Sequence, residues 1–453
     1  MSLRFPVAVI ISVIAAVSCA CSARADDDSG RISKSDDAQA ATLRERLAAA
    51  GFEFSATYIG ETLGNVSGGL RTGGIYTGRL DLGTTVDLEK VVGWSGATFH
   101  ANMYQIHGDG LSRDFIGNLM LVSGVEALPA TRLYEMWIEQ KLLGGRVAVR
   151  VGQQASDVEF FDSSYDDMFA NSALGWPGIT GINLPGGGPS PPLAVPGIRV
   201  KAQLSDSLTA FLAVFDGYPA PPVPGDPQIL NPHGVLFRVT DPPWWIGQLK
   251  YKFGIGESGL PAMITAGAWY HMGAFSDQRL TAEGLSIADP AGLGQPGLLF
   301  RNNGIFFVYE QMLARAATNP DKGVAFFLRG STSPSDRNLI DLYFDGGFLF
   351  TGFSEKRPND KFGIAATYAR ISSDARQFDR DVQIFTGTPY PVRDYEAILE
   401  INYQAEICPN FVVQPLFQYV IHPGGGVVDP GDPTQSHRIR DAAVFGVRTT
   451  ITY

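Results

Sequence analysis

One stretch of the sequence, SDVEFFDSSYDDMFANSALGWPG at residues 156–178, combines carboxylates with aromatic rings. Carboxylates accept hydrogen bonds from hydroxyl groups, and aromatic faces pack against the nonpolar faces of other rings. The stretch could therefore bind a hydroxylated, ring-shaped solute; the alternative is an ordinary surface loop whose rings pack on its own rim. The residues concerned are Asp157, Glu159, Phe160, Phe161, Asp162, Tyr165, Asp166, Asp167, Phe169 and Trp176.

A second set of charged and polar residues occupies every other position of several extended segments. Facing walls of opposite charge could orient water and hydroxylated solutes; alternatively, these residues only solvate a water-filled space and pair with one another. Trp137 is unusual on such a polar face, where it could stack on a solute or support a neighbouring loop. The set consists of Arg79, Asp81, His100, Asn102, Glu135, Trp137, Glu139, Arg146, Arg150, Glu396, Glu400 and Arg448.

Catalytic and cofactor-binding motifs give no comparable signal. The six histidines lack HExxH or similar spacing, so we expect no metal site. GIGESG at residues 254–259 fits the glycine pattern of dinucleotide-binding loops, but a strand-like run follows it instead of a helix, which predicts a turn. The sequence contains neither GxSxG nor a GxxxxGK[ST] phosphate-binding loop. We therefore expect no catalytic residue and no cofactor.

The elements that must position these residues are β-strands, because apolar and polar residues alternate along most of the chain. Residues 395–406, YEAILEINYQAE, show the alternation most clearly, and residues 132–142 place Tyr134, Met136 and Ile138 opposite Glu135 and Glu139. We count about sixteen such segments, many of ten residues or more. Strands of globular proteins have ~5–6 residues, whereas a tilted strand needs ~9–11 to cross a bilayer. The lengths favour membrane strands over a soluble sandwich.

The connections between these segments alternate between short and long. Short links such as 142–146, 205–207 and 408–410 separate longer segments such as 108–131 and 154–196. Tight turns on one side and long loops on the other are typical of an antiparallel transmembrane barrel. We predict an all-β, 16-stranded barrel over residues 51–453, closed by pairing of the last strand, which ends at Tyr453, with the first, near residues 52–59.

The N-terminus has the pattern of an export signal. Arg4 precedes an apolar core, and Ala23-Arg24-Ala25 forms a small-x-small cleavage site, so residues 1–25 are expected to be removed. Residues 26–50 are expected to form a flexible lead and a short periplasmic helix that ends near Gly51. The formal net charge is −11, which opposes nucleic-acid binding. Only Cys408 would remain after cleavage, so no intramolecular disulfide is expected.

Several segments together resemble the carbohydrate-selective outer-membrane porins, the OprB-like family. They are GWSGATFHANMYQIHGDGLSRDFIGNL, TRLYEMWIEQKLLGGRVAVRVGQQASDVEFF, FANSALGWP, and a C-terminal part with INYQAEICPNFVVQPLFQYVIHPGGG and FGVRTTITY. The resemblance implies a sixteen-stranded barrel in the outer membrane of a Gram-negative bacterium, through which glucose and other small sugars diffuse. It also implies that the third outer loop, residues 154–196, folds into the barrel and narrows it.

The expected partners are outer-membrane lipids and small sugars as transported solutes, with a homo-oligomer as a possibility and no nucleic acid. Three alternatives stay open at this point. The porin could pass another small polar solute, such as an organic acid. The barrel could be an outer-membrane enzyme with a serine and a histidine near the rim. The chain could also be a soluble, secreted β-protein that binds sugar.

Overall fold

The computed structural model describes residues 44–255, 259–316, 319–352 and 354–453. Two compact units are distinguished, Met1–Glu53 and Phe54–Tyr453. In the first, residues 44–49 are helical; the predicted signal peptide (1–25) and the lead up to residue 43 lie outside the described residues. No helix in the described part of the chain is long and apolar enough to cross a membrane.

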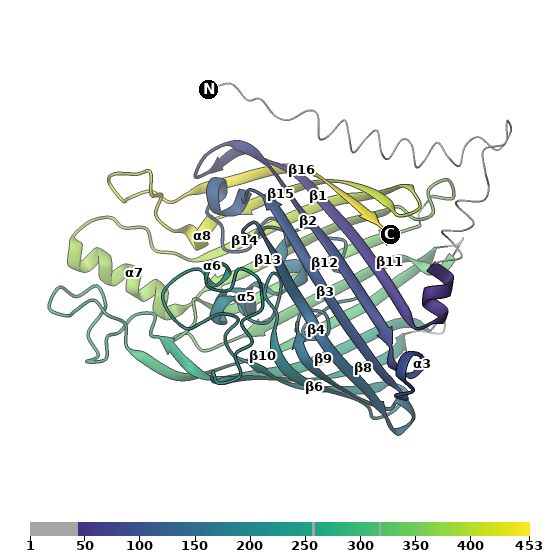
Figure 1. Ribbon diagram of the computed structural model, residues 1–453. Helices are drawn as coiled ribbons and strands as arrows, with labels where there is room; N and C mark the ends of the chain where they lie inside the picture. Colours follow the sequence, from purple (N-terminus) through teal and green to yellow (C-terminus); the bar gives the residue numbers. More distant parts are fainter. Residues whose placement is uncertain (1–43, 256–258, 317–318, 353) are drawn as a thin grey trace. The chain divides into compact units, whose positions relative to one another are not determined.

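The second unit is a closed antiparallel β-barrel in which each strand pairs with its neighbours in sequence and β1 pairs with β16 (Figure 1). The described residues thus confirm the predicted sixteen-stranded barrel. The strands are β1 (Phe52–Gly69), β2 (Gly73–Asp87), β3 (Ala97–Gly108), β4 (Ala130–Leu142), β5 (Val147–Gln154), β6 (Val195–Gln203), β7 (Leu208–Asp216), β8 (Pro243–Ile255), β9 (Leu260–Ser276), β10 (Leu298–Ala316), β11 (Asn319–Thr332), β12 (Ile340–Thr351), β13 (Lys361–Ile371), β14 (Tyr395–Cys408), β15 (Phe411–Ile421) and β16 (Arg440–Thr452).

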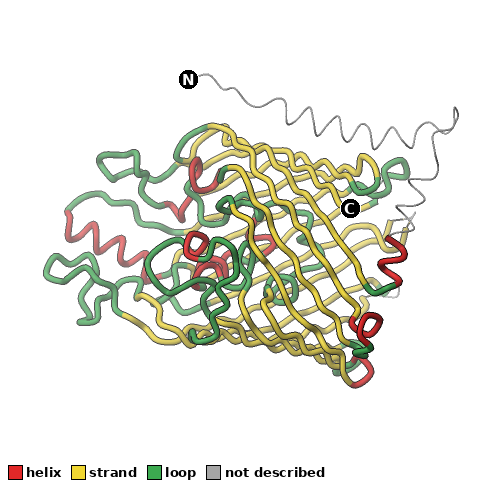
Figure 2. The backbone as a smooth tube through the Cα atoms, in the orientation of Figure 1, coloured by secondary structure: helices red, strands yellow, loops and turns green. Residues whose placement is uncertain are grey.

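Between the strands of the described chain, helices are short and lie in the connections (Figure 2). The longest, with 14 residues, is capped by the Ser372 side chain at its start and by Gly387 in the left-handed conformation at its end. The helices are α3 (Leu88–Val92), α4 (Ser172–Gly175), α5 (Gly178–Asn183), α6 (Pro227–Leu230), α7 (Ser373–Thr386) and α8 (Pro423–Gly426), with the single turns η1 (Ser112–Ile116), η2 (Leu143–Gly145) and η3 (Pro185–Gly187).

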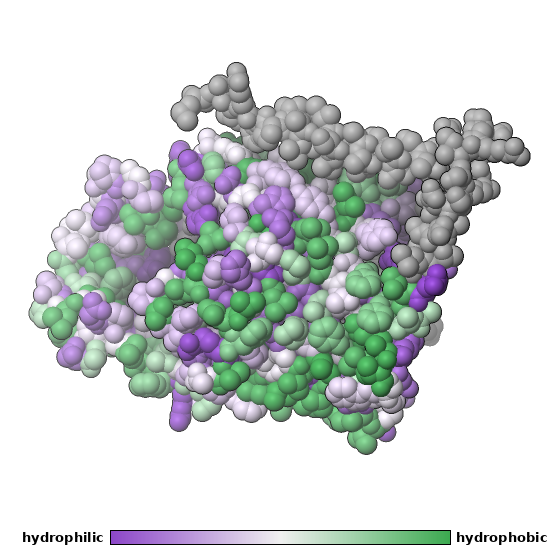
Figure 3. Space-filling model, viewed as in Figure 1, coloured by the Kyte–Doolittle hydropathy of each residue, from purple (hydrophilic) through white to green (hydrophobic). Residues whose placement is uncertain are grey.

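The alternation of the sequence becomes the two faces of the barrel wall. In β14 the even-numbered residues Glu396, Ile398, Glu400 and Asn402 are buried inside the barrel, and the odd-numbered apolar residues face outward. Figure 3 shows hydrophobic side chains gathered over the outward faces of the strands visible in that view. This outer surface suits lipid, and the inner surface is left for polar side chains.

The two ends of the barrel differ as predicted. Described connections at one end are short, at 88–96, 143–146, 204–207, 352–360 and 409–410. Those at the other end include the long segments 109–129, 155–194, 217–242, 277–297, 372–394 and 422–439, although 70–72 and 333–339 are short. We call 109–129 the second loop, 155–194 the third loop and 422–439 the eighth loop. Half of the predicted turn GIGESG, residues 256–258, lies outside the described residues.

One register irregularity changes the direction of a predicted side chain. Between β3 and β4 the register shifts at Asn102 and Met103, and Tyr134 is the extra residue on β4. Tyr134 and Glu135 are both buried, at 2% and 8% exposure. Tyr134 stacks on Tyr104 with ring centroids 4.3 Å apart. The prediction that Tyr134 shares the outer face with Met136 and Ile138 was therefore wrong, because strict alternation does not foresee a bulge.

The seam between β1 and β16 closes the barrel, as the C-terminal alternation predicted. Glu61 lies opposite Arg448 in the register, and the Arg448 Nε donates to the Glu61 carboxylate over 2.6 Å. Both side chains are nearly inaccessible to solvent, at 0% and 10%. Phe445 and Val447, on the other face of β16, are exposed outward. The seam is thus joined by a ladder of backbone bonds and one inward ion pair.

We expect Glu61→Leu to lower the free energy of unfolding by about 3 kcal/mol, because it leaves the Arg448 guanidinium buried without its carboxylate. The double variant E61L/R448L should recover most of that loss. The measurement is urea unfolding of the purified barrel in lipid vesicles, followed by the heat-dependent mobility shift of folded barrels on gels. If each single variant loses unfolding free energy and the loss in the double variant equals the sum of the two, the two residues do not act as a pair.

Candidate functional site

The third loop is folded into the barrel, and its aromatic rings pack on the wall. Phe161 stacks on Phe306 of β10 with ring centroids 4.5 Å apart, and Phe160 contacts the edge of Phe211 of β7 at 6.0 Å. Trp176 meets Trp244 of β8 edge to face at 6.4 Å. Phe160 and Phe161 are 1% and 0% exposed, so they anchor the loop and do not offer faces to a solute.

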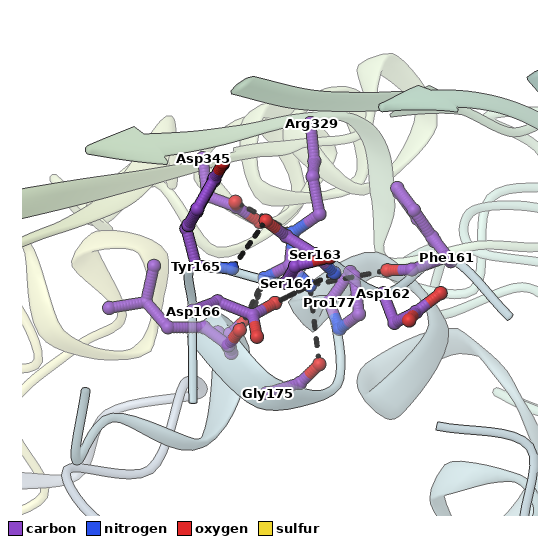
Figure 4. Close-up of polar contacts among 12 residues, drawn as sticks. Phe161, Asp162, Ser163, Ser164, Tyr165, Asp166, Gly175, Pro177, Arg329 and Asp345 are labelled. Atoms are coloured by element: carbon purple, nitrogen blue, oxygen red, sulfur yellow. Dashed lines mark hydrogen bonds and ion pairs between the residues drawn. The ribbon is translucent and has the colours of Figure 1, made fainter. Parts of the chain in front are cut away.

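Arg329 of β11 is the central polar anchor of the third loop (Figure 4). Its Nε donates to Asp345 of β12 over 2.8 Å, and its Nη1 donates to the Asp166 carboxylate over 2.7 Å. The remaining guanidinium bonds go to backbone carbonyls of the loop, at Phe161, Ala173, Leu174 and Gly175, over 2.6–3.3 Å. Arg329 is fully buried, and two carboxylates neutralise it, so it crosslinks two parts of the loop to the wall.

Wall carboxylates hold the backbone amides of the same loop. Glu400 of β14 accepts the N–H groups of Ala170 and Asn171 over 2.7 and 2.9 Å. Glu135 of β4 accepts the Ala155 N–H over 2.8 Å, and Glu310 of β10 accepts from the Ser163 hydroxyl and the Ser164 N–H. Buried backbone donors need partners, and a carboxylate can serve two at once. The inner acids therefore fix the path of the loop.

The second loop is held in the same way and lies against the third. Glu396 of β14 accepts the N–H groups of Leu119 and Met120 over 2.8 Å each, and also that of Gly424 in the eighth loop. Gln418 of β15 donates to the Val122 carbonyl over 2.7 Å. The backbone of the two loops meets where the Ser172 N–H donates to the Leu121 carbonyl over 2.9 Å. The two loops form one layer across the lumen.

On the opposite wall, four charged residues from β4, β5, β6 and the third loop neutralise one another. Arg199 donates to Glu139 and to Glu159 over 2.6 Å each, and Arg150 lies 3.0 Å from Glu139 and 3.6 Å from Glu159. The Arg150 guanidinium also lies over the Trp137 ring at 3.9 Å. This cluster ties the third loop to the wall, so its charges are already satisfied by protein groups.

Small-molecule sites have volumes of about 300 to 1,000 Å³. A cavity of about 500 Å³ lies between the two loops and the β1, β2 and β16 wall. We call it the upper cavity. Its polar and aromatic lining residues include Arg79, Glu126, Asp157, Asp166, Asp167, Phe169, Asn171, Trp176, Gln228 and Arg448, and apolar residues such as Leu119, Met120, Leu121 and Ile182 line the rest together with small residues of both loops. Arg448 donates here to the Phe169 and Ala170 carbonyls over 3.4 Å each.

Two charged groups of the upper cavity keep free bonding capacity. Within the described part of the chain, no hydrogen bond or ion pair engages the Arg79 guanidinium, which lies over the Tyr104 ring at 4.5 Å and has a buried Nε without an acceptor. The Asp167 carboxylate has no hydrogen-bond partner among these residues either, and it is exposed to the cavity. A donor and an acceptor are thus left for a solute.

Asp157 gives the upper cavity a titratable charge near neutral pH. Burial raises the pKa of its carboxyl to about 7, and the neighbouring Glu135 carboxylate contributes to the rise. The Tyr134 hydroxyl donates to Asp157 over 3.4 Å. Among the described residues, no three His, Cys, Asp or Glu side chains are arranged to hold a metal ion.

The structure brings seven of the sequence-predicted residues together in the upper cavity, namely Arg79, Asp157, Asp166, Asp167, Phe169, Trp176 and Arg448. Asp81 and Asn102 lie next to it on β2 and β3, joined by a 3.0 Å hydrogen bond, and His100 stacks on Trp137 at 4.9 Å. Arg146 lies at the exposed turn after β4. The others hold loops or one another, as described above: Glu135, Trp137, Glu139, Arg150, Glu159, Phe160, Phe161, Glu396 and Glu400.

Sequence reasoning missed the anchors Arg199, Glu310, Arg329 and Asp345, and also Gln248 of β8, whose side-chain oxygen accepts the Phe161 N–H over 3.1 Å. A signal was present for Arg329. If residues 324–332, VAFFLRGST, form a strand, Arg329 lies on the same face as Ala325 and Phe327. An arginine within an apolar face requires buried acceptors. Which acceptors it finds depends on the path of the third loop, which no local pattern encodes.

Comparisons with known proteins agree with this architecture. The family described as "Carbohydrate-selective porin, OprB family" matches residues 71–453. Porin B of Pseudomonas aeruginosa is 24% identical over 423 residues, covering 89% of each chain. The putative porin QuiX of Acinetobacter baylyi is 22% identical over 416 residues, covering 84% of this chain and 87% of that protein.

Among solved structures, the high-pH structure of Pseudomonas putida OprB resembles the chain with a TM-score of 0.79 and 21% identity. The similarity covers 92% of this chain and 97% of that one. At this identity the likeness supports the fold, and the family match over most of the chain supports the membership.

We expect Arg329→Met to release the third loop, because it removes every guanidinium bond to the loop and leaves Asp166 and Asp345 buried without a cation. The free energy of unfolding should fall by about 3–5 kcal/mol. Single-channel conductance in planar bilayers should rise, since the loop no longer narrows the lumen. Arg380→Met, at an exposed arginine on α7, should change neither quantity. A folded R329M barrel with unchanged conductance would contradict the anchoring role.

We expect the ion selectivity of the channel to change with pH through Asp157. Because its folded-state pKa is about 7, the carboxyl is largely neutral at pH 6 and charged at pH 8. Cation selectivity, measured by reversal potentials in a salt gradient, should therefore rise as the pH increases across this range. The step should disappear in Asp157→Asn and persist in Glu283→Gln, which removes an exposed outer-loop acid. A step that persists in D157N would assign it to another group.

Proposed function

The chain belongs to the OprB family of carbohydrate-selective porins, and we propose that this member passes glucose and similar small sugars, which bind in the upper cavity on their way through the lumen. The porin is an outer-membrane channel and not an enzyme. Passage is facilitated diffusion: the solute enters from the side of the long loops, exchanges hydrogen bonds with the wall and leaves toward the periplasm. Weak binding is required, since tight binding would stop conduction.

The observation that carries this proposal is the free bonding capacity of Arg79 and Asp167 in a cavity that Trp176 also lines. A sugar hydroxyl both donates and accepts hydrogen bonds, so it can use a guanidinium and a carboxylate together. Trp176 is 8% exposed, and its Nε1 donates to the Gly187 carbonyl over 2.8 Å, which fixes the orientation of the ring. A neutral polyol satisfies these groups without adding charge to the cavity.

The rigidity of the two inward loops supports selectivity. Their backbone groups are bound by Arg329, Glu396 and Glu400, so the cavity is formed before a solute arrives. A preformed site loses little conformational entropy when it binds. It can therefore distinguish solutes by the placement of their hydroxyl groups even though each contact is weak.

A small organic acid is the second candidate solute, and the Arg79 guanidinium is the observation that favours it. A carboxylate binds such a group by charge-assisted hydrogen bonds. The surrounding charges favour a neutral solute instead: Asp167 has no cationic partner in the described structure, and Arg448 is neutralised by Glu61. We infer that anions enter this cavity less readily than neutral sugars.

Two further features complete the proposed function. Residues 1–25 would direct export and be cleaved, so that the mature protein begins with the lead at residues 26–50 and continues with the barrel. A homo-oligomer stays a prediction. Neither feature alters the route of the solute through a single barrel.

We expect proteoliposomes with the purified porin to take up glucose faster than a neutral non-sugar of equal size and faster than succinate, with uptake that saturates. Arg79→Gln should reduce glucose uptake about three- to tenfold, the loss expected for hydrogen bonds worth about 0.5–1.5 kcal/mol. Lys252→Gln, a cation on β8 that does not line the upper cavity, is the matched control. Equal uptake of both neutral solutes would contradict sugar selectivity, and faster succinate would favour the organic acid.

A further inference from the structure

A second pocket lies on the periplasmic side of the third loop, between β11 and β15, with a volume of about 310 Å³. We call it the lower pocket. It is lined by Lys322, Thr351, Asn359, Lys361, Gln404, Glu406 and Val412. None of these residues lines the upper cavity, so the two spaces are separate.

The lower pocket begins directly beneath the tip of the third loop. Gly363 of β13 lies against Met168: a Cβ atom at Gly363 would come within 2.7 Å of the Met168 Sδ. Lys361 is two residues earlier on the same face of β13, one step closer to the periplasm. The Met168 carbonyl accepts from the Gln414 amide over 2.7 Å and from the Gln404 amide over 3.3 Å. The pocket therefore lies on the lumen wall, where a solute arrives after passing the loop.

The polar groups of the lower pocket form a row across three neighbouring strands. In the register, Thr351 of β12 lies opposite Lys361 of β13, and Lys361 lies opposite Gln404 of β14. Glu406 follows Gln404 on the same face of β14. Diagonal neighbours of this kind have Cα atoms about 7–8 Å apart, and Lys361 and Glu406 both line the pocket.

Lys361 and Glu406 differ from most inner charges, because protein groups do not satisfy their side chains. In the ranges that the structure describes, neither the Lys361 ammonium nor the Glu406 carboxylate forms a hydrogen bond or an ion pair. By contrast, Lys322 donates to the Pro358 carbonyl and to the Asn359 side chain, which fixes the rim of the pocket. Protein contacts thus fix the rim of the lower pocket, while Lys361 keeps a donor and Glu406 an acceptor free for a solute.

We propose that the lower pocket is a second binding site for the transported polyhydroxylated solute, which occupies it after passing the third loop and before leaving for the periplasm. The Lys361 ammonium donates to solute hydroxyl oxygens, the Glu406 carboxylate accepts from solute hydroxyls, and Gln404 and Thr351 can do both. Two weak sites in series let a solute leave the first without returning fully to water, as conduction requires. The proposal rests on the proposed function.

The experiment is single-channel recording in planar bilayers, with all channels inserted in one orientation and glucose added to one chamber at a time. Glucose binding is measured as current noise, which gives an affinity from each side. Lys361→Met and Glu406→Gln should each weaken binding from the periplasmic chamber about three- to tenfold. Binding from the extracellular chamber at low glucose should be unchanged, which also shows that the variants fold.

Lys356→Met is the matched control, because Lys356 is an exposed lysine of the turn 352–360 that does not line the pocket. It should leave glucose binding from both chambers unchanged. If K361M and E406Q bind glucose from the periplasmic side as the wild type does, the lower pocket is not a site, while the upper cavity stands. If the wild type shows no glucose-dependent noise from either chamber, both the proposed function and the lower pocket are contradicted.

Discussion

The need to satisfy backbone polar groups inside the barrel determines the rest of this structure. The second and third loops carry peptide N–H and C=O groups into a lumen where neighbouring protein excludes much of the water. Each unpaired group would be costly there, so the wall supplies partners. Glu396 and Glu400 bind amides, and Arg329 binds carbonyls. The wall and the loops therefore form one interlocked unit.

This constraint divides the inner charges into two classes. Charges such as Arg199, Arg329 and Glu400 are engaged with loops and with one another, so they give the constriction its shape. Arg79 and Asp167 are not, so they are available to a solute. A polar lumen residue is therefore assigned to transport by its lack of protein partners and not by its charge alone.

Much of the fold could be predicted from the sequence, because successive side chains of a barrel strand point alternately outward and into the lumen, so the apolar and polar pattern repeats every two residues. The strands, the alternation of turns and loops, and the closure of β16 on β1 follow from local patterns. The site could be predicted only in part. Alternation predicts that Arg79 and Arg448 face the lumen, but which groups Glu396 or Trp137 contact depends on the path of the inward loops. That path arises from contacts between residues far apart in sequence, such as Asp166 with Arg329. The bulge at Tyr134 is likewise not predicted by any local sequence pattern.

The most direct test of this account is amide hydrogen exchange of the folded porin in lipid, resolved to single residues. If wall carboxylates hold the inward loop, the amides of Ala155, Ala170 and Asn171 exchange as slowly as those of the strands, although they lie in a connection with little regular structure. Exchange of these amides as fast as that of the exposed outer segment 277–297 would contradict it. The constriction, and the cavity that it bounds, would then not exist in the working channel.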